Sequence, residues 1–264
     1  LLPVEPVTPL IPVATPDLPT ANAAETTPLQ PEQIKVSEPP LTPSVDQAPL
    51  PLLDESDAAI KNEISSIVAS ALREPLSVRW LGDNLLRRFV TFVANIAEGK
   101  LDTKSSPLLP PKTRFAVSSS VPPVMTEDSH ARFNTHIQIV TSISPATCAA
   151  TYRRYYPLLQ GAYADLGEKK TFHSVLLTAI DLVIAAPEPE DEPLLVAADK
   201  GLLKFADPKL EALPAAQKPL LRMGRDNATQ LKQWLRQFRA AVLATPTNSE
   251  STSVPVTMPS QASD

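Results

Sequence analysis

The chain has 264 residues, a net charge of −5, a single cysteine, and 30 prolines against only 6 glycines. One cysteine excludes an intramolecular disulfide, and the longest nearly apolar run, residues 175–186, is too short to cross a bilayer. The excess of proline excludes one uniform globular domain, because folded domains seldom contain so much of it.

Proline and charge divide the chain into three parts. Residues 1–51 hold 13 of the prolines and no glycine or aromatic residue, so we predict a disordered, Pro-rich spacer there. Residues 245–264 are rich in Ser, Thr and Pro and are predicted to form a disordered tail. The helical domain is therefore expected over residues 52–244. Its charge is nearly balanced, which argues against a nucleic-acid partner.

Two amphipathic helices are predicted at the start of this domain. The first has Asp54 as its N-cap and apolar residues at spacings of three and four, and it ends before Pro75. The second begins near Asp83 and stops at Gly99. Five prolines then exclude a helix from residues 100–129, which we expect to wrap the surface with a short strand at 114–117.

The second half of the domain is also predicted to be helical. Helices are expected over 131–143, from Ser144 to Leu166 with a kink at Pro157, and over 172–185. A small hairpin pairs residues 194–196 with 202–205, and short helices open at Asp207-Pro208 and at Pro214. The last helix is expected to be capped by Asp226 or Asn227 and to turn three cations to solvent: Lys232, Arg236 and Arg239. The fold class is thus mostly α, a single multi-helix domain with one small β-hairpin.

Several strings of residues, in a fixed order, cover nearly all of 52–244. They are LDESD (53–57), RRFV with ANIAEGK (87–100), RFAV (114–117), YPLL with AYADLG (156–167), FADPKLEAL (205–213), and QKPLLRMG with NA (217–228). Together they resemble an uncharacterised bacterial family, numbered 3014 among the domains of unknown function. The chain departs from this resemblance at Glu168-Lys169-Lys170, where the family tends to have an aromatic-Pro turn.

The resemblance implies a place in the cell but no chemistry. Proteins similar to this one typically have a short cytoplasmic start, one transmembrane helix, a Pro-rich linker and this domain in the periplasm. The chain begins with Leu1, so we expect an anchor or a signal peptide upstream of it. The family has no established functional residues, and none can be transferred to this chain.

The densest aromatic and basic cluster lies between residues 152 and 163. Tyr152, Tyr156 and Tyr163 share one helical stripe, which is typical of a core face. The alternative is a binding groove in which tyrosines stack and Arg153 and Arg154 bind carboxylates.

Four ionisable residues interrupt apolar helical patterns, where a charge has to be exposed or paired. We expect a buried ion network among them, with a functional pocket as the alternative: Arg88, Asp181, Lys218 and Arg222.

Metal and catalytic constellations are not found in the sequence. His130 and His136 lie on opposite sides of a helix and cannot share one metal ion. We predict that these two and His173 are surface or capping histidines, with no metal site or cofactor. The acidic residues between Pro187 and Pro193 lack the pattern of a calcium loop and are predicted to form a solvated loop. Cys148 has no histidine at helical spacing and is expected to be a packing residue.

These observations favour a non-catalytic interaction or scaffold domain of the cell envelope, held at the inner membrane by its Pro-rich linker. Its partner is expected to be an envelope protein or peptidoglycan. The alternative is an enzyme that acts on cell-wall or other periplasmic substrates, but the residues do not converge on any of the usual acid, base or nucleophile sets.

Overall fold

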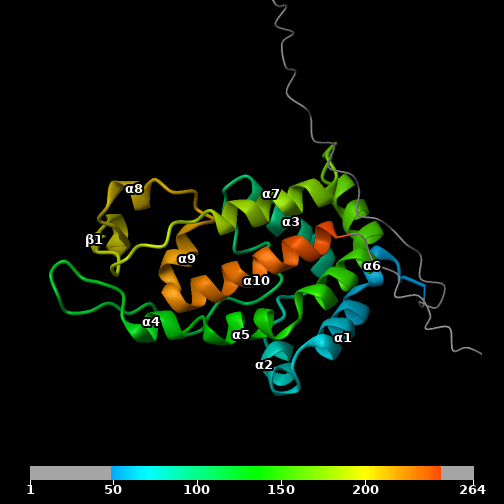
Figure 1. Cartoon of the computed structure of the whole chain (residues 1–264), viewed down its shortest axis with the longest axis horizontal. Helices are drawn as coiled ribbons and strands as arrows, with labels where there is room; N and C mark the ends of the chain where they lie inside the picture. Colours follow the sequence, from blue (N-terminus) through cyan, green and yellow to red (C-terminus); the bar gives the residue numbers. More distant parts are fainter. Residues whose placement is uncertain (1–48, 245–264) are drawn as a thin grey trace, which may run out of the picture. The chain divides into compact units, whose positions relative to one another are not determined.

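The computed structural model describes residues 49–244. For Lys200 it describes the backbone and not the exposure of the side chain. Nearly all of the predicted spacer, residues 1–48, and the whole predicted tail lie outside the described residues. Figure 1 labels the elements. The α-helices are α1 Asp57–Ile67, α2 Arg73–Ser77, α3 Leu85–Ala97, α4 Glu127–Ala131, α5 Asn134–Ser142, α6 Pro145–Ala164, α7 Phe172–Ile184, α8 Pro208–Glu211, α9 Lys218–Arg222 and α10 Arg225–Leu243. One antiparallel hairpin joins β1 Leu195–Ala197 to β2 Leu203–Phe205, with Val196 opposite Lys204.

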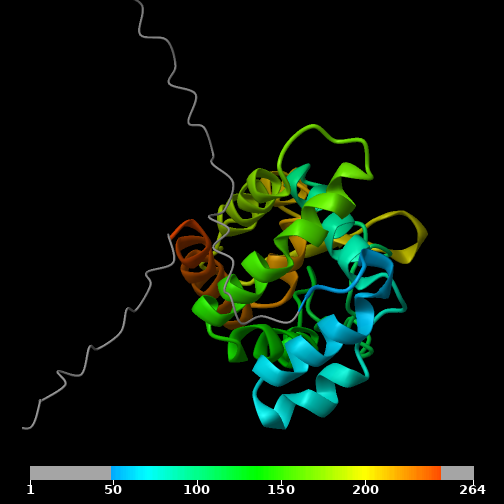
Figure 2. The same ribbon diagram turned by 90° about the vertical axis from the view of Figure 1, so that its right-hand side faces the viewer.

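Four helices form the centre of the domain. α3 packs against α6 and α7, and α10 packs against α5, α6, α7 and α9. The last helix lies between α7 on one side and α5 on the other (Figures 1 and 2). The core between them is rich in aromatic residues, including the fully buried Phe172 and Tyr156. Burial of these rings from several helices supplies the main apolar stabilisation of the fold.

The segment between α3 and α4 runs along the surface, as its prolines predict, but α4 begins at Glu127, inside the stretch 100–129 from which a helix was excluded. The segment is pinned by isolated β-bridges: Trp80 pairs with Leu108, and Val117 pairs with Met125. The expected strand at 114–117 is therefore reduced to a single bridge at its last residue.

Several local predictions are confirmed. The Ser144 hydroxyl accepts a hydrogen bond from the Thr147 amide and Pro145 opens α6, while Asp207 caps α8 in the same way. Gly99 follows α3 with a φ of +76°, a left-handed conformation that glycine adopts without strain. The mostly helical fold with one hairpin is as predicted.

The start of the domain differs from its prediction. The first helix is not continuous to Pro75, because the chain is extended at Val68 and a second helix, α2, contains Pro75. Asp54 caps nothing and lies in a short 3-10 turn, Leu53–Glu55. Asp57 instead accepts hydrogen bonds from the Asn84 and Leu85 amides, and so caps α3 from a neighbouring helix.

The last helix also begins differently. Gly224 rather than Asp226 or Asn227 is its N-cap, with a φ of +80°, and a β-carbon there would lie 2.7 Å from Cγ of His130. This contact allows only glycine at the junction of α9 and α10. Lys232, expected in solvent, is 2% exposed.

Candidate functional site

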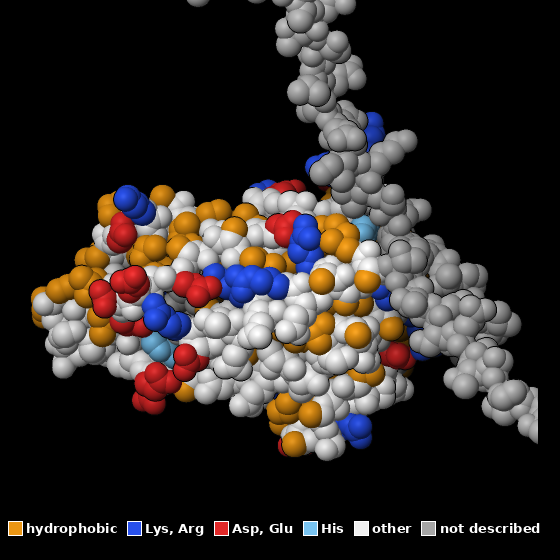
Figure 3. Space-filling view, viewed as in Figure 1, with side chains coloured by type: hydrophobic (Ala, Val, Ile, Leu, Met, Phe, Trp, Pro, Cys, Tyr) orange, Lys and Arg blue, Asp and Glu red, His pale blue; other side chains and the backbone are white. Residues whose placement is uncertain are grey.

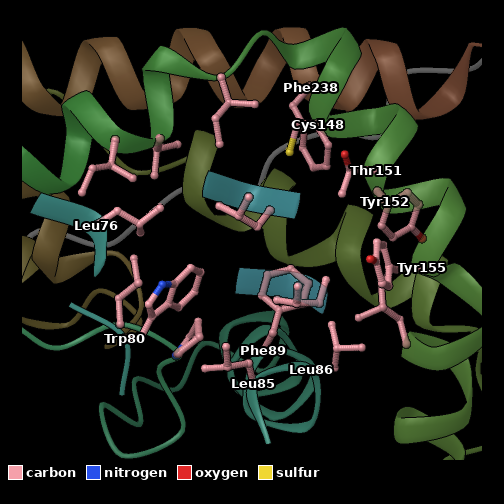
Figure 4. Close-up of a pocket in the computed structure, with 18 of the residues that line it drawn as sticks. Leu76, Trp80, Leu85, Leu86, Phe89, Cys148, Thr151, Tyr152, Tyr155 and Phe238 are labelled. Atoms are coloured by element: carbon pink, nitrogen blue, oxygen red, sulfur yellow. The ribbon is translucent and has the colours of Figure 1, made fainter. Parts of the chain in front are cut away.

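A cavity of about 280 Å³ lies between α1, α2, α3, α5, α6 and α10. None of its lining residues is charged. They are Ile60, Ile64, Leu76, Trp80, Leu85, Leu86, Phe89, Pro107, Leu108, Ile139, Val140, Ile143, Cys148, Thr151, Tyr152, Tyr155, Leu159, Trp234 and Phe238. Figure 4 shows Leu85, Leu86 and Phe89 of α3 on the side opposite Cys148 and Phe238.

Helical spacing places the lining residues of α6 and α10. In α6, residues at spacings of three and four turn one face to the cavity: Cys148, Thr151, Tyr152, Tyr155 and Leu159. In α10, Trp234 and Phe238 are four residues apart, and their rings stack with centroids 5.2 Å apart. The Trp234 Nε1 donates to the Ile143 carbonyl at 2.8 Å, which fixes α10 to the end of α5.

Two polar groups of the lining, on Tyr152 and Cys148, are bonded within the protein or held neutral. The Tyr152 hydroxyl is 3.1 Å from Nδ1 of the buried His173. Burial raises the pKa of Tyr152 and raises that of Cys148 to about 12. The thiol is therefore protonated at neutral pH, which is the opposite of what a cysteine nucleophile requires. The arrangement suits the binding of an apolar group.

The four residues predicted from sequence to bind a partner have other contacts in this structure. Tyr152 and Tyr156 are 6% and 2% exposed, and Tyr152 alone lines the cavity. Arg153 donates to the carbonyls of Ala241 and Ala244 at the end of α10. Arg154 forms an ion pair with Glu63 of α1 at 2.9 Å. The tyrosines thus lie in the core, while the arginines tie α6 to two neighbouring helices.

The expected ion network is replaced by four separate contacts. Asp181 binds Arg239 through both carboxylate oxygens, and it is 53% exposed. Lys218 pairs with Glu211, while two arginines donate to carbonyls: Arg88 to Asp83 and Lys104, and Arg222 to Leu203. Over α7 and α10, acidic and basic side chains are neighbours at the surface (Figure 3).

Two predictions about single residues need correction. His173 is neither a surface nor a capping residue but is 2% exposed, and burial lowers its pKa. Lys232 is buried because its ammonium donates to the Ala186 carbonyl and to Glu188, at 2.7 Å from the latter. Glu188 belongs to the acidic run, so one end of that run is fixed to α10.

Sequence reasoning gave no role to Trp80 or Trp234, the two tryptophans of the chain. Both line the cavity. The spacing of Trp234 to Phe238 places the two rings on one side of a helix, a signal that was available in the sequence. The bridge that brings Trp80 to Leu108 is a contact between distant segments, which no local pattern reveals.

A family model described as "Protein of unknown function (DUF3014)" matches residues 85–239. The chain belongs to this family. The comparison confirms the resemblance drawn from the sequence strings. No curated protein and no solved structure matches the chain.

The DUF3014 match includes most of the cavity but not all of it. The cavity residues of α1 and α2, such as Ile60 and Leu76, come before residue 85 and lie outside the match. Trp80 lies outside it as well. Within residues 49–244, no cluster of three or more His, Cys, Asp or Glu side chains could hold a metal. No helix of that same part is both long and apolar enough to span a membrane.

Proposed function

We propose that this DUF3014 domain is a non-catalytic binding module of the bacterial cell envelope, and that its cavity takes up a hydrocarbon chain. The observation that carries the proposal is the uncharged lining of a cavity of about 280 Å³. A polypeptide in this space would leave its amide groups without partners, whereas a hydrocarbon chain has no polar group to satisfy. An apolar lining favours apolar molecules over water.

The sequence supports a proposed setting for this module. A Pro-rich spacer that precedes the domain would hold it at a distance from an inner-membrane anchor, facing the periplasm. Of the two partner classes predicted, an envelope protein offers apolar side chains or an attached acyl chain. Peptidoglycan is a polar polymer and matches this cavity poorly. The protonated Cys148 thiol favours binding over catalysis.

Tryptophan fluorescence tests the proposal, because both tryptophans of the chain line the cavity. A brominated medium-chain alcohol is a suitable probe, since bromine quenches indole fluorescence at short range and the molecule is uncharged. We expect saturable quenching of the full chain. Thr151→Leu adds volume to the lining and is expected to weaken binding about tenfold or more, the effect of roughly 1.4 kcal/mol.

The matched control is Thr229→Leu, the same change at an exposed position of α10 outside the lining. It is expected to leave the affinity within about twofold, because a surface substitution rarely affects a distant site. Equal quenching in Thr151→Leu and Thr229→Leu would refute the cavity as the binding site. If an apolar peptide quenched the fluorescence and the alcohol did not, the proposed ligand would be a protein partner instead of a hydrocarbon chain.

A further inference from the structure

A second pocket, of about 220 Å³, lies on the other side of the Trp80–Leu108 bridge from the apolar cavity. The backbones of Arg79 and Leu109 are joined by a hydrogen bond of 2.7 Å beside this bridge. Arg79 and Leu109 line the second pocket, while Trp80 and Leu108 line the apolar cavity. The paired backbones therefore lie between the two sites. The two sites share no lining residue.

The second pocket is cationic. Arg79, Lys112 and Arg132 line it together with His136, and none of its lining residues is acidic. Among the residues that the structure describes, no carboxylate forms an ion pair with any of the three cations. Charges of one sign that converge without a counter-ion create a potential that favours an anion.

Arg132 is held in place by aromatic rings. Its guanidinium carbon lies 4.7 Å from the Phe133 ring centroid and 5.2 Å from that of Phe115. Arg222 lies over the same Phe115 ring, at 5.5 Å, and adds a second positive charge nearby. Burial and this charge lower the pKa of Arg132. The Arg132 Nε is buried without a hydrogen-bond acceptor, which is uncommon in folded proteins.

The His136 ring needs a hydrogen-bond donor, whereas the three cations of the pocket need acceptors. Its Nε2 is 2.9 Å from the Leu109 carbonyl, which can only accept, so Nε2 carries the hydrogen. Nδ1 is then an acceptor in the neutral ring, and it is buried with no partner. Burial, together with the charge of Arg79, lowers the pKa of His136 and favours this neutral form.

We propose that this pocket binds a phosphate group that keeps a hydroxyl, as hydrogen phosphate does. Its charged oxygens accept from the arginines and Lys112, and its hydroxyl donates to Nδ1 of His136. Carboxylate and sulfate bring only acceptors at neutral pH, and would leave Nδ1 facing a lone pair. The site is independent of the function proposed for the apolar cavity, because it has its own lining and its own ligand.

Calorimetry on the full chain with inorganic phosphate and with sulfate tests this proposal. Phosphate is expected to bind at least about tenfold more tightly than sulfate, because only phosphate satisfies Nδ1. Phosphate is also expected to shift the NMR resonance of His136 Nδ1. Equal affinities for the two anions, or no shift at His136, would overturn the proposal.

Charge variants locate the site. Arg132→Gln is expected to weaken phosphate binding about tenfold and Lys112→Gln about threefold, since each removes one cation. Lys112 is exposed, so its variant is expected to fold normally. Arg114→Gln is the matched control, because Arg114 is exposed in the same segment and does not line the pocket. An effect of Arg114→Gln equal to those of the other two would reduce binding to a general surface charge and contradict the site.

The source of the phosphate is distinguished by a third ligand, methyl phosphate, titrated alongside inorganic phosphate just below about pH 6, where the monoester still keeps one hydroxyl because its second pKa is near 6. Binding as tight as that of inorganic phosphate supports a phosphate monoester, such as a lipid headgroup, as the ligand. Binding by inorganic phosphate alone supports the free anion. If neither inorganic phosphate nor methyl phosphate bound, the proposal would be wrong for the free anion and for the monoester.

Discussion

Lys232 has the lowest exposure of any lysine or arginine whose burial is described, and its ammonium has two hydrogen-bond partners there. The ammonium donates to the Ala186 carbonyl and to the Glu188 carboxylate. Burial of an ammonium without such partners would cost several kcal/mol. The hydrogen bond from Lys232 is also the main cause that lowers the pKa of Glu188. One buried cation thus fixes the end of α7 to the middle of α10.

We expect Lys232→Met to lower the free energy of unfolding by about 1–3 kcal/mol, because the Ala186 carbonyl loses its donor. The pKa of Glu188 is expected to rise in the same variant. Chemical denaturation and NMR titration of the carboxyl group measure the two effects. Arg236→Met, at an exposed position of the same helix, is the control and is expected to change stability by less than about 0.5 kcal/mol. Equal stability of both variants would mean that Lys232 is solvated.

Asp181 interrupts the most apolar helix of the domain, yet the structure places it at the surface in a bidentate pair with Arg239. Exposed pairs contribute little, since water solvates each charge almost as well. We therefore expect Asp181→Ala to cost less than about 1 kcal/mol in denaturant unfolding. A loss of about 3 kcal/mol or more would instead place this carboxylate in a buried network.

At the scale of helices, residues of one helix often complete the end of another. Asp57 of α1 caps the start of α3, and Arg153 of α6 donates to the last carbonyls of α10. A cation at a helix C-terminus also interacts favourably with the helix dipole. The arginine that the sequence suggested for partner binding therefore stabilises the packing of α6 on α10.

We expect Arg153→Glu to destabilise the domain by about 1–2 kcal/mol, because a carboxylate at the end of α10 repels its free carbonyls. Hydrogen exchange in the last turn of α10 should speed up in this variant. The control is Arg236→Glu, the same charge reversal at an exposed site of α10. If Arg153→Glu unfolded like that control, Arg153 would be free for a partner, as the groove hypothesis requires.

At the scale of the whole molecule, two histidines couple stability to pH. Burial lowers the pKa of His136 and of His173 from an ordinary value of 6.5. Below that value the unfolded chain binds protons that the folded domain does not, so the stabilisation is complete above it and declines as the pH falls. Glu188 and Glu211, whose pKa values are lowered by lysine partners, add a further loss below about their ordinary 4.5.

Denaturant unfolding at a series of pH values checks this. We expect stability to fall on acidification from pH 6.5, and His173→Gln to make that slope shallower, since one titrating group is removed. The readout is the slope rather than the absolute stability, which the substitution alters in any case. A slope that is unchanged in His173→Gln would show that His173 titrates alike in the folded and unfolded chain.

Much of the fold was predictable because its signals are local. Ser144-Pro145 opens α6 and Gly99 ends α3, through caps that depend on neighbouring residues alone. The burial of Lys232 was not predictable, because its partners lie more than forty residues away. The break at Val68 was not predictable either, because it also depends on distant residues. It places α1 and α2 on the walls of a cavity formed by distant helices.

The candidate site was predictable only in part. The tyrosine stripe correctly indicated a core face, and Tyr152 of that stripe reaches the cavity. The cavity itself arises where side chains of several helices leave space unfilled, which is a property of packing and not of any one segment. For the same reason, the cationic pocket required the pairing of residues near 80 with those near 108 before Arg79 and His136 came together.

The central claim, that the apolar cavity binds a hydrocarbon chain, is tested most directly by intermolecular NOEs. The full chain is mixed with an unlabelled medium-chain alcohol, and contacts from its methylene protons are assigned. We predict NOEs to the indole protons of Trp80 and Trp234, because both rings line the cavity. NOEs restricted to exposed apolar side chains such as Val121 and Leu202 would contradict the claim.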